Sequence, residues 1–129
     1  MEEFKYKSAL LIDDSYIDNL INRKILEGIR FAENIVVMDS PFRAMSYLTR
    51  ALENNEAPEV IFLDIRMPGM TGFELIQELE ELKQKFNSNF KIYMLSSSLD
   101  PNDLKQVEDL ALVARFIGKP LTAKALEEI

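Results

Sequence analysis

The chain of 129 residues contains no histidine and no cysteine. Histidine is the commonest general base in enzymes and a frequent zinc ligand, and cysteine supplies thiolates and disulfides. Their absence excludes Ser-His-Asp and Cys-His mechanisms as well as disulfide bonds. Any chemistry of this chain must therefore rest on carboxylates, hydroxyls, lysine and a hard metal ion.

Long apolar runs and an excess of positive charge are also missing. No apolar run approaches the roughly 18 to 20 residues that cross a bilayer, and the N-terminal sequence MEEFKYKS does not fit a secretory signal. We therefore expect a cytoplasmic protein without membrane contact. The net charge of −7, from 15 basic and 22 acidic side chains, argues against direct nucleic-acid binding. The length and composition predict one globular domain over residues 1–129.

Five short apolar runs alternate with amphipathic segments. Continuous hydrophobicity is typical of parallel strands that helices cover on both faces, so we expect strands at 9–12, 35–38, 60–63, 92–95 and 113–117. This alternation predicts an α/β fold of five βα units with a five-stranded parallel sheet. The last helix has room for only about two turns after Thr122, so we expect it to be short or truncated.

Apolar periodicity and capping residues mark the helices. In the first helix, the residues expected mainly on one face are Ile17, Leu20, Ile21, Leu26 and Ile29. The expected N-terminal caps are Ser15, Ser40 before Pro41, Thr71 in a capping box with Glu74, Asp100 before Pro101, and Thr122.

Polar residues follow four of the five expected strands. In parallel sheets, sites form beyond the carboxyl ends of the strands. The residues found there are Asp13, Asp14, Asp64, Ser96 and Lys119. Each has a simpler interpretation, since Asp14 could cap the first helix, Ser98 could cap the fourth, and Lys-Pro is a common turn.

Three clustered acids repel one another and raise their pKa values unless a cation lies among them. Magnesium prefers oxygen ligands and commonly pairs with phosphate. We expect Asp14 and Asp64 to ligate Mg²⁺ directly, and Asp13 to do so directly or through a water. Lys119 and Ser96 would then face an anion that the metal attracts.

The ordered motifs LLIDDS, LDIRMPGMTGFEL, MLSSS and FIGKPL resemble the receiver domains of two-component response regulators. The resemblance covers essentially the whole chain from Lys7. It implies a flavodoxin-like fold with strand order 2-1-3-4-5 and a role as a phosphorylation-dependent signalling switch, not as an enzyme acting on other substrates. It also implies a histidine kinase or histidine phosphotransfer protein as phosphoryl donor, and an unknown downstream protein as target.

The resemblance further implies a role for each matching residue. Asp64 would be the phosphoacceptor, and Asp13 and Asp14 would hold Mg²⁺ together with the backbone carbonyl of Arg66. Ser96 would be the switch hydroxyl, and Lys119, followed by a cis proline, would bind a phosphoryl oxygen. Phe116 would change rotamer and alter the face of the fourth helix, fifth strand and last helix, where a homodimer could form.

Phe116 without this resemblance would be an ordinary half-buried strand aromatic. Five positions depart from the common family pattern or vary within it. Serine stands at Ser96 in place of the commoner threonine, Leu112-Val113 replaces smaller residues, and Arg66 and Ser98 occupy positions that tune the lifetime of the phosphoryl group.

Two other functions use similar residues or a similar sheet. A Mg²⁺-dependent small-molecule phosphatase or phosphotransferase also forms an aspartyl phosphate, but it usually has a DxD nucleophile motif on the first strand and a cap domain. A flavin-binding module needs a phosphate loop rich in hydroxyls and glycine after the first strand. The sequence DDSYID places acids there, which would repel a flavin phosphate.

Overall fold

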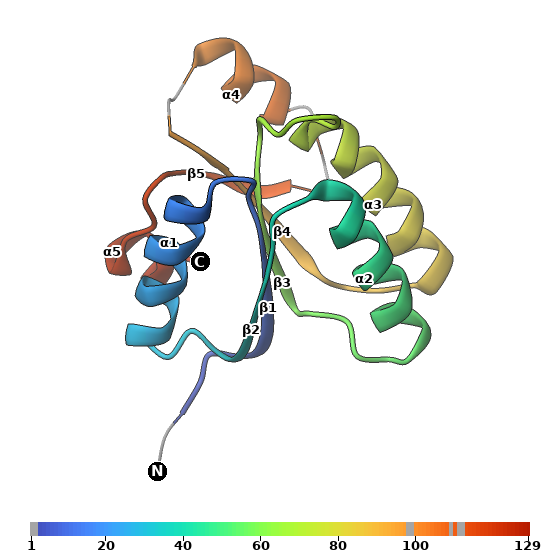
Figure 1. Cartoon of the computed structure of the whole chain (residues 1–129), viewed down its shortest axis with the longest axis horizontal. Coiled ribbons are helices and arrows are strands. Elements are labelled where there is room, and N and C mark those ends of the chain that lie inside the picture. Colours follow the sequence, from blue (N-terminus) through green and yellow to red (C-terminus); the bar gives the residue numbers. More distant parts are fainter. Residues whose placement is uncertain (1–2, 98–99, 109, 111–112) are drawn as a thin grey trace.

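A computed structural model of the chain describes residues 3–97, 100–108, 110 and 113–129, and within these not the side chains of 107 and 108. In the described part, strands and helices alternate along the chain (Figure 1). The strands are β1 (Tyr6–Ile12), β2 (Ala32–Met38), β3 (Val60–Asp64), β4 (Lys91–Ser96) and β5 (Val113–Gly118). The helices are α1 (Tyr16–Gly28), α2 (Pro41–Glu53), α3 (Gly72–Phe86), α4 (Pro101–Glu108) and α5 (Ala123–Glu127).

The five strands form one parallel sheet in the order β2-β1-β3-β4-β5, which confirms the predicted fold class. Strand β3 lies at the centre, and all five of its residues are buried. Strand β1 begins at Tyr6 rather than at the predicted Ala9. Its first residues alternate in exposure, so the continuous apolar pattern marked only its fully buried second half.

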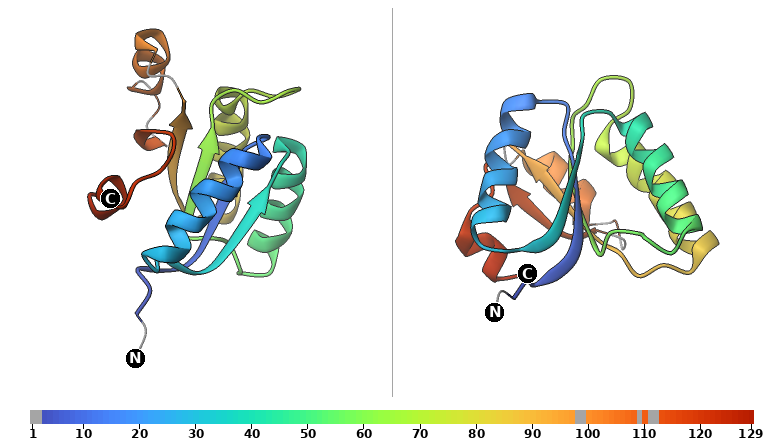
Figure 2. Two further views of the ribbon diagram at one scale, coloured as in Figure 1. Left: turned by 60° about the vertical axis from the view of Figure 1, so that its left-hand side comes forward. Right: turned by 60° about the horizontal axis from the view of Figure 1, so that its bottom comes forward.

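Helices α1 and α5 cover one face of the sheet, and helices α2 and α3 cover the other (Figures 1 and 2). The α2/α3 face packs around buried leucines and isoleucines such as Leu48, Ile61 and Leu79. The opposite face includes a row of aromatic rings whose centroids lie 5.1 to 5.7 Å apart, formed by Tyr6, Phe31, Phe62 and Tyr93. The rigid sheet between these two layers fixes the positions of the strand ends.

The predicted capping residues begin the helices as expected. A side-chain oxygen of each cap accepts a hydrogen bond from a backbone N–H of the first turn, which satisfies a donor that the helix leaves unpaired. These caps are Ser15, Ser40, Thr71, Asp100 and Thr122. Asp14 is therefore not the cap of α1, because Ser15 holds that position. Ser98 lies outside the described residues.

The exposure of helix α1 differs from the prediction. Of the apolar residues expected on its buried face, only Leu26 is fully buried, whereas Ile17 is 64% exposed and Leu20 is 42% exposed. The buried side of α1 carries Asn19 and Asn22 beside Leu26. Apolar periodicity therefore located the helix correctly but assigned the wrong face to the core.

Helix α5 spans Ala123–Glu127. Within the described ranges, no helix combines the length and apolar character needed to cross a membrane.

Candidate functional site: an acidic pocket at the strand ends

The ends of β1 and β3 bring three carboxylates together. Ile12 pairs with Leu63 in the sheet, so Asp13 and Asp64 follow neighbouring positions on adjacent strands. Each of Asp13, Asp14 and Asp64 offers a carboxylate oxygen, and these oxygens all lie within 4.8 Å of one another. Asp13 and Asp64 are buried, whereas Asp14 is exposed to solvent. A group of hard oxygen donors open on one side suits a small divalent cation.

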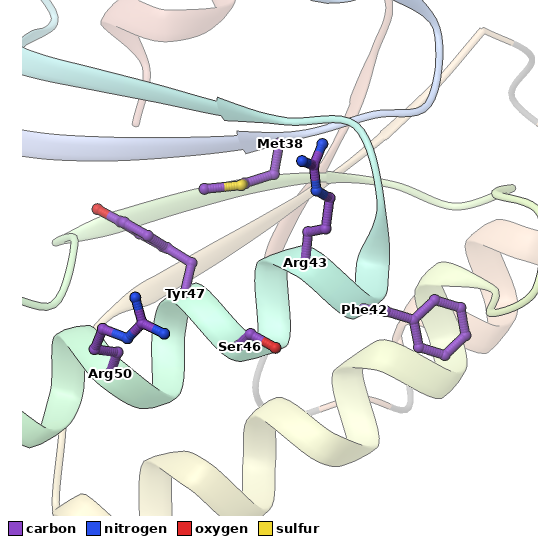
Figure 3. Close-up of a pocket in the computed structure, with 6 residues that line it drawn as sticks. All are labelled: Met38, Phe42, Arg43, Ser46, Tyr47 and Arg50. Atoms are coloured by element: carbon purple, nitrogen blue, oxygen red, sulfur yellow. The ribbon is translucent and has the colours of Figure 1, made fainter.

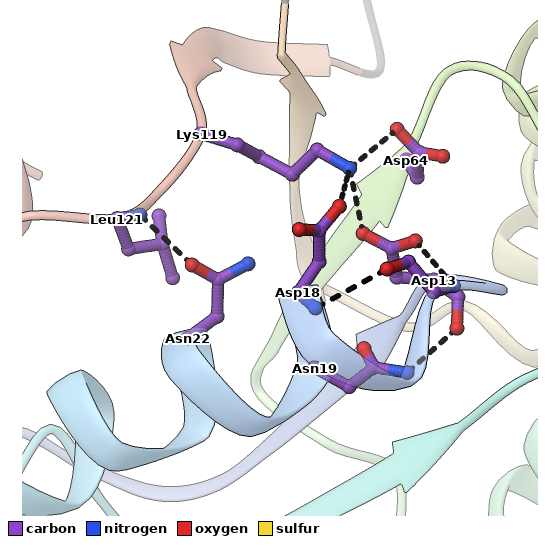
Figure 4. Close-up of polar contacts among 8 residues, drawn as sticks. Asp13, Asp18, Asn19, Asn22, Asp64, Lys119 and Leu121 are labelled. Carbon is purple, nitrogen blue, oxygen red and sulfur yellow. Dashed lines mark hydrogen bonds and ion pairs between the residues drawn. The ribbon is translucent and has the colours of Figure 1, made fainter.

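Lys119, which directly follows β5, supplies the positive charge of this pocket (Figure 4). Its Nζ donates hydrogen bonds of 2.8 Å to Asp13 Oδ2 and 2.8 Å to Asp18 Oδ2. The same Nζ lies 3.3 Å from Asp64 Oδ1. The Lys119-Pro120 peptide bond is cis, as the motif predicted.

The pKa values of Asp64 and Lys119 are both raised, but for different reasons. Burial raises the pKa of Asp64 to about 6, and the neighbouring Asp13 carboxylate adds to this shift. The Lys119 ammonium opposes it only in part, because its shorter contacts are to Asp13 and Asp18. For Lys119, burial lowers the pKa, but the hydrogen bonds to Asp13 and Asp18 outweigh burial, so the pKa is raised overall.

The loop after Asp64 is held tightly at its far end. Gly72 donates its N–H to the carbonyl of Ile65 at 2.6 Å, and a Cβ on Gly72 would lie 2.6 Å from the backbone oxygen of Asp64. Only glycine permits this close approach of α3 to the strand end. Met67 in the same loop is buried and packs in the α2/α3 core.

Three residues of α1 take part in the site although the sequence analysis did not select them. Asp18 contacts Lys119, and Asn19 Nδ2 donates to the backbone carbonyl of Asp13 at 2.6 Å. Asn22 Oδ1 accepts a hydrogen bond of 2.9 Å from the N–H of Leu121. One pattern in the sequence could have identified them. Asp18, Asn19 and Asn22 have the spacing i, i+1, i+4, which places three polar side chains on a side of α1 away from Ile17 and Ile21.

The other predicted residues lie around the pocket. Ser96 ends β4 and is half-buried, and its carbonyl accepts a 2.7 Å hydrogen bond from the N–H of Lys119. Phe116 is half-buried on β5 and packs against the α2/α3 core. The Arg66 side chain forms a 2.9 Å ion pair with Asp103 of α4. The proposed metal contact of the Arg66 carbonyl remains a prediction.

A separate hollow lies along α2 and the end of β2 (Figure 3). It has a volume of about 580 Å³ and is lined by Met38, Phe42, Arg43, Ser46, Tyr47 and Arg50. None of these residues belongs to the acidic pocket. We consider the pocket at the strand ends to be the functional site, because it alone gathers buried acids around a buried ammonium among the described residues.

Comparisons with known proteins agree with this geometry. The family model of the response regulator receiver domain matches residues 9–129. The two-component response regulator ARR17 of Arabidopsis thaliana is 34% identical over 125 residues, which cover 87% of this chain and 77% of that protein. ORR1 of Oryza sativa subsp. japonica is 28% identical over 94% of this chain but only 52% of its own length. The chain thus spans between about half and three quarters of these relatives.

Solved structures show the same fold. A two-component response regulator from Cytophaga hutchinsonii superposes with a TM-score of 0.89 at 36% identity, covering 95% of this chain and 92% of that one. The receiver domain of the histidine kinase CKI1 from Arabidopsis thaliana, described as complexed with Mg²⁺, has a TM-score of 0.83 at 20% identity over 95% of this chain and 90% of that one. The second likeness supports the fold alone.

Proposed function

The chain belongs to the response regulator receiver domain family, and from this premise we propose that Asp64 is its phosphoacceptor and that a phosphohistidine of a partner protein is the donor. Receiver domains of response regulators are phosphorylation switches and not conventional enzymes. The observation that supports Asp64 is its place at the end of the central strand, among two further acids and within 3.3 Å of the Lys119 ammonium.

Mg²⁺ fits this donor set, and we assign it to Asp13, Asp14, Asp64 and the backbone carbonyl of Arg66. The support is the grouping of carboxylate oxygens within 4.8 Å, in which the Asp13 carboxylate adds to the rise that burial causes in the pKa of Asp64. When bound, Mg²⁺ would offset the negative charge of the incoming phosphoryl group.

In the transfer step, a carboxylate oxygen of Asp64 attacks the phosphorus of the donor. The new O–P bond forms while the N–P bond to the imidazole breaks, and the electron pair of that bond returns to the imidazole nitrogen. Lys119 would bind a phosphoryl oxygen and hold the group in line. The chain itself contains no histidine, so the donor imidazole must belong to another molecule or to a segment outside this sequence.

The resulting acyl phosphate would act through Ser96 and Lys119. The Ser96 hydroxyl would donate a hydrogen bond to the phosphoryl group, and the Lys119 N–H to Ser96 carbonyl bond links the two loops that would move. Phe116 would then turn inward and change the α4–β5–α5 face, to which a downstream protein or a second copy of the chain would bind. Support for this role is that Phe116 is neither fully buried nor fully exposed.

Intact-mass measurement after incubation with Mg²⁺ and acetyl phosphate tests this proposal. We expect one phosphoryl group per chain, none in Asp64→Asn, and full uptake in the control Asp39→Asn, which removes an exposed acid of a surface ion pair. Unchanged uptake in Asp64→Asn would place the acceptor elsewhere. Repeated turnover of a phosphomonoester would instead favour the small-molecule phosphatase.

A further inference from the structure

The Lys119 ammonium has more acidic neighbours than the phosphoryl-transfer site requires. Its closest contacts are 2.8 Å to Asp13 Oδ2 and 2.8 Å to Asp18 Oδ2, whereas Asp64 Oδ1 is 3.3 Å away (Figure 4). Lysine carries three N–H donors and no acceptor. Asp13 and Asp18 therefore take the two shortest contacts of Lys119, and the ammonium lies nearer to them than to Asp64, where a phosphoryl oxygen would bind.

Helix α1 fixes Asp18 in this position. The Ser15 side chain caps the helix by accepting from the N–H of Asp18 itself. One residue further, Asn19 donates to the carbonyl of Asp13, and one turn later Asn22 accepts from the N–H of Leu121, two residues beyond Lys119. Both α1 bonds to the neighbouring loops are buried. Asp18 thus belongs to a firmly anchored helix turn, and its side chain, which is 37% exposed, reaches Lys119 from a fixed stretch of backbone.

Building on the proposed function, we propose that Asp18 is a restraining residue that holds the Lys119 ammonium away from the phosphoryl group on Asp64. Its carboxylate competes with the phosphoryl oxygens for the Lys119 ammonium. Asp18 consequently weakens phosphoryl binding and shortens the lifetime of the acyl phosphate. It is a positioning residue that acts through Lys119 and does not touch the reacting atoms.

Replacing Asp18 by asparagine should therefore improve the site. With Mg²⁺ present, we expect Asp18→Asn to bind beryllofluoride about three- to ten-fold more tightly than the unaltered chain, and its acyl phosphate to last longer by a similar factor, the range expected for one partly exposed charged contact. Isothermal titration measures the affinity, and intact mass over time measures the lifetime. A gain cannot be the result of damaged folding, and Asp18→Ser provides a second neutral variant.

Glu27→Gln is the matched control. It removes the same charge from the same helix, but Glu27 pairs with Arg23 on the surface and lies nine residues from Asp18, which is about 13 Å along a helix. Screening makes a general charge effect small at that distance. The affinity of Glu27→Gln should stay within about two-fold of the unaltered chain. Equal gains in beryllofluoride affinity in both variants would show that the effect comes from net charge alone, which would overturn the proposal.

A double-mutant cycle tests whether Asp18 acts through Lys119. In a Lys119→Ala background, Asp18→Asn should leave the beryllofluoride affinity within about two-fold of Lys119→Ala alone, since the restrained group is gone. NMR titration to millimolar beryllofluoride measures such weakened binding. A full gain in this background, or no gain in Asp18→Asn alone, would refute the restraint. If instead the unaltered chain neither binds beryllofluoride nor takes up a phosphoryl group, the proposed function itself fails.

Discussion

On one flank of the acidic pocket, helix α1 contacts the site through Asp18, Asn19 and Asn22. On the other flank, Asp103 of α4 forms an ion pair with Arg66 of the loop that follows Asp64. The α1 contacts of Asn19 and Asn22 are buried. The partner of Asp103 is Arg66, whose side chain is 72% exposed. The first flank is thus built to hold groups in place, and the second is joined by a contact that costs little to break.

This difference suits a switch that must keep its chemistry fixed while its surface changes. The side bearing Lys119 has to preserve distances of about 3 Å for phosphoryl transfer. Helix α4 belongs to the proposed output face, so a weak link to the phosphoacceptor loop permits it to shift. The comparison predicts a graded series of mutational effects, which is largest at Lys119 and smallest at Arg66.

Lys119→Ala should produce the largest loss of stability. It would leave buried Asp13 without its cation, and uncompensated buried charges typically cost about 3 to 5 kcal/mol of unfolding free energy. Urea denaturation at neutral pH with a chelator measures this loss, with Lys24→Ala on the exposed side of α1 as control. Added Mg²⁺ should restore part of the stability, because the three acids remain. A loss below about 1 kcal/mol would contradict the importance assigned to the α1 flank.

Asp64 should make the stability of the metal-free protein fall as pH rises. Its folded-state pKa of about 6 lies above the ordinary value of 3.8, so the folded chain binds more protons than the unfolded chain between these values. Its contribution is therefore fully present below about pH 4 and is lost as pH rises through about 6, by at most about 3 kcal/mol. Comparison with Asp64→Asn isolates the effect: this variant should be the more stable one at pH 7.5, and equal pH profiles would rule out the raised pKa.

Asn22→Ala should have an intermediate effect. It leaves the buried N–H of Leu121 without its acceptor, which costs about 1 to 3 kcal/mol. Thermal or urea unfolding measures the loss. Asn34→Ala, at an exposed position of β2, serves as the control and should change stability by less than about 0.5 kcal/mol. Equal effects of the two variants would show that the anchoring of α1 to the Leu121 loop contributes nothing specific.

Arg66→Ala should change global stability least. The Asp103 carboxylate is buried, but it lies in the first turn of α4, where the helix dipole also favours it, and the Arg66 side chain is 72% exposed, so the loss should be about 1 kcal/mol. Hydrogen exchange of the α4 amides should nevertheless become faster, because a contact of this helix with the phosphoacceptor loop is removed. Arg50→Ala, on the exposed side of α2, should leave that exchange unchanged. Slower or unaltered exchange in Arg66→Ala would argue against a link between the two segments.

The sequence alone was sufficient for the parts of the fold that depend on local patterns. Apolar runs located the central strands, and Ser15 and Thr71 marked helix starts, because a cap acts within one turn of its own helix. The acids and Lys119 could be placed together because parallel strands end at one edge of the sheet.

The sequence alone could not predict how α1 contacts the site. Asn19 and Asn22 are buried with one amide atom each bonded to the carbonyl of Asp13 and to the N–H of Leu121, and the second of these partners is 99 residues away in the chain. A pattern of apolar spacing cannot predict such pairing, so the periodicity of Ile17 and Leu20 indicated the wrong face. The contact of Asp18 with Lys119 depends on the same docking of distant segments.

The absence of a side chain at Gly72 has a mechanical consequence. The backbone of α3 packs directly against the carbonyl of Asp64. The end of β3 and the start of this helix therefore form one rigid unit, and Asp64 cannot shift towards α3. Any rearrangement that follows phosphorylation must then occur in the segments that approach Asp64 from outside. Asp64 therefore stays in place, and the Lys119 ammonium and the Ser96 hydroxyl move towards it.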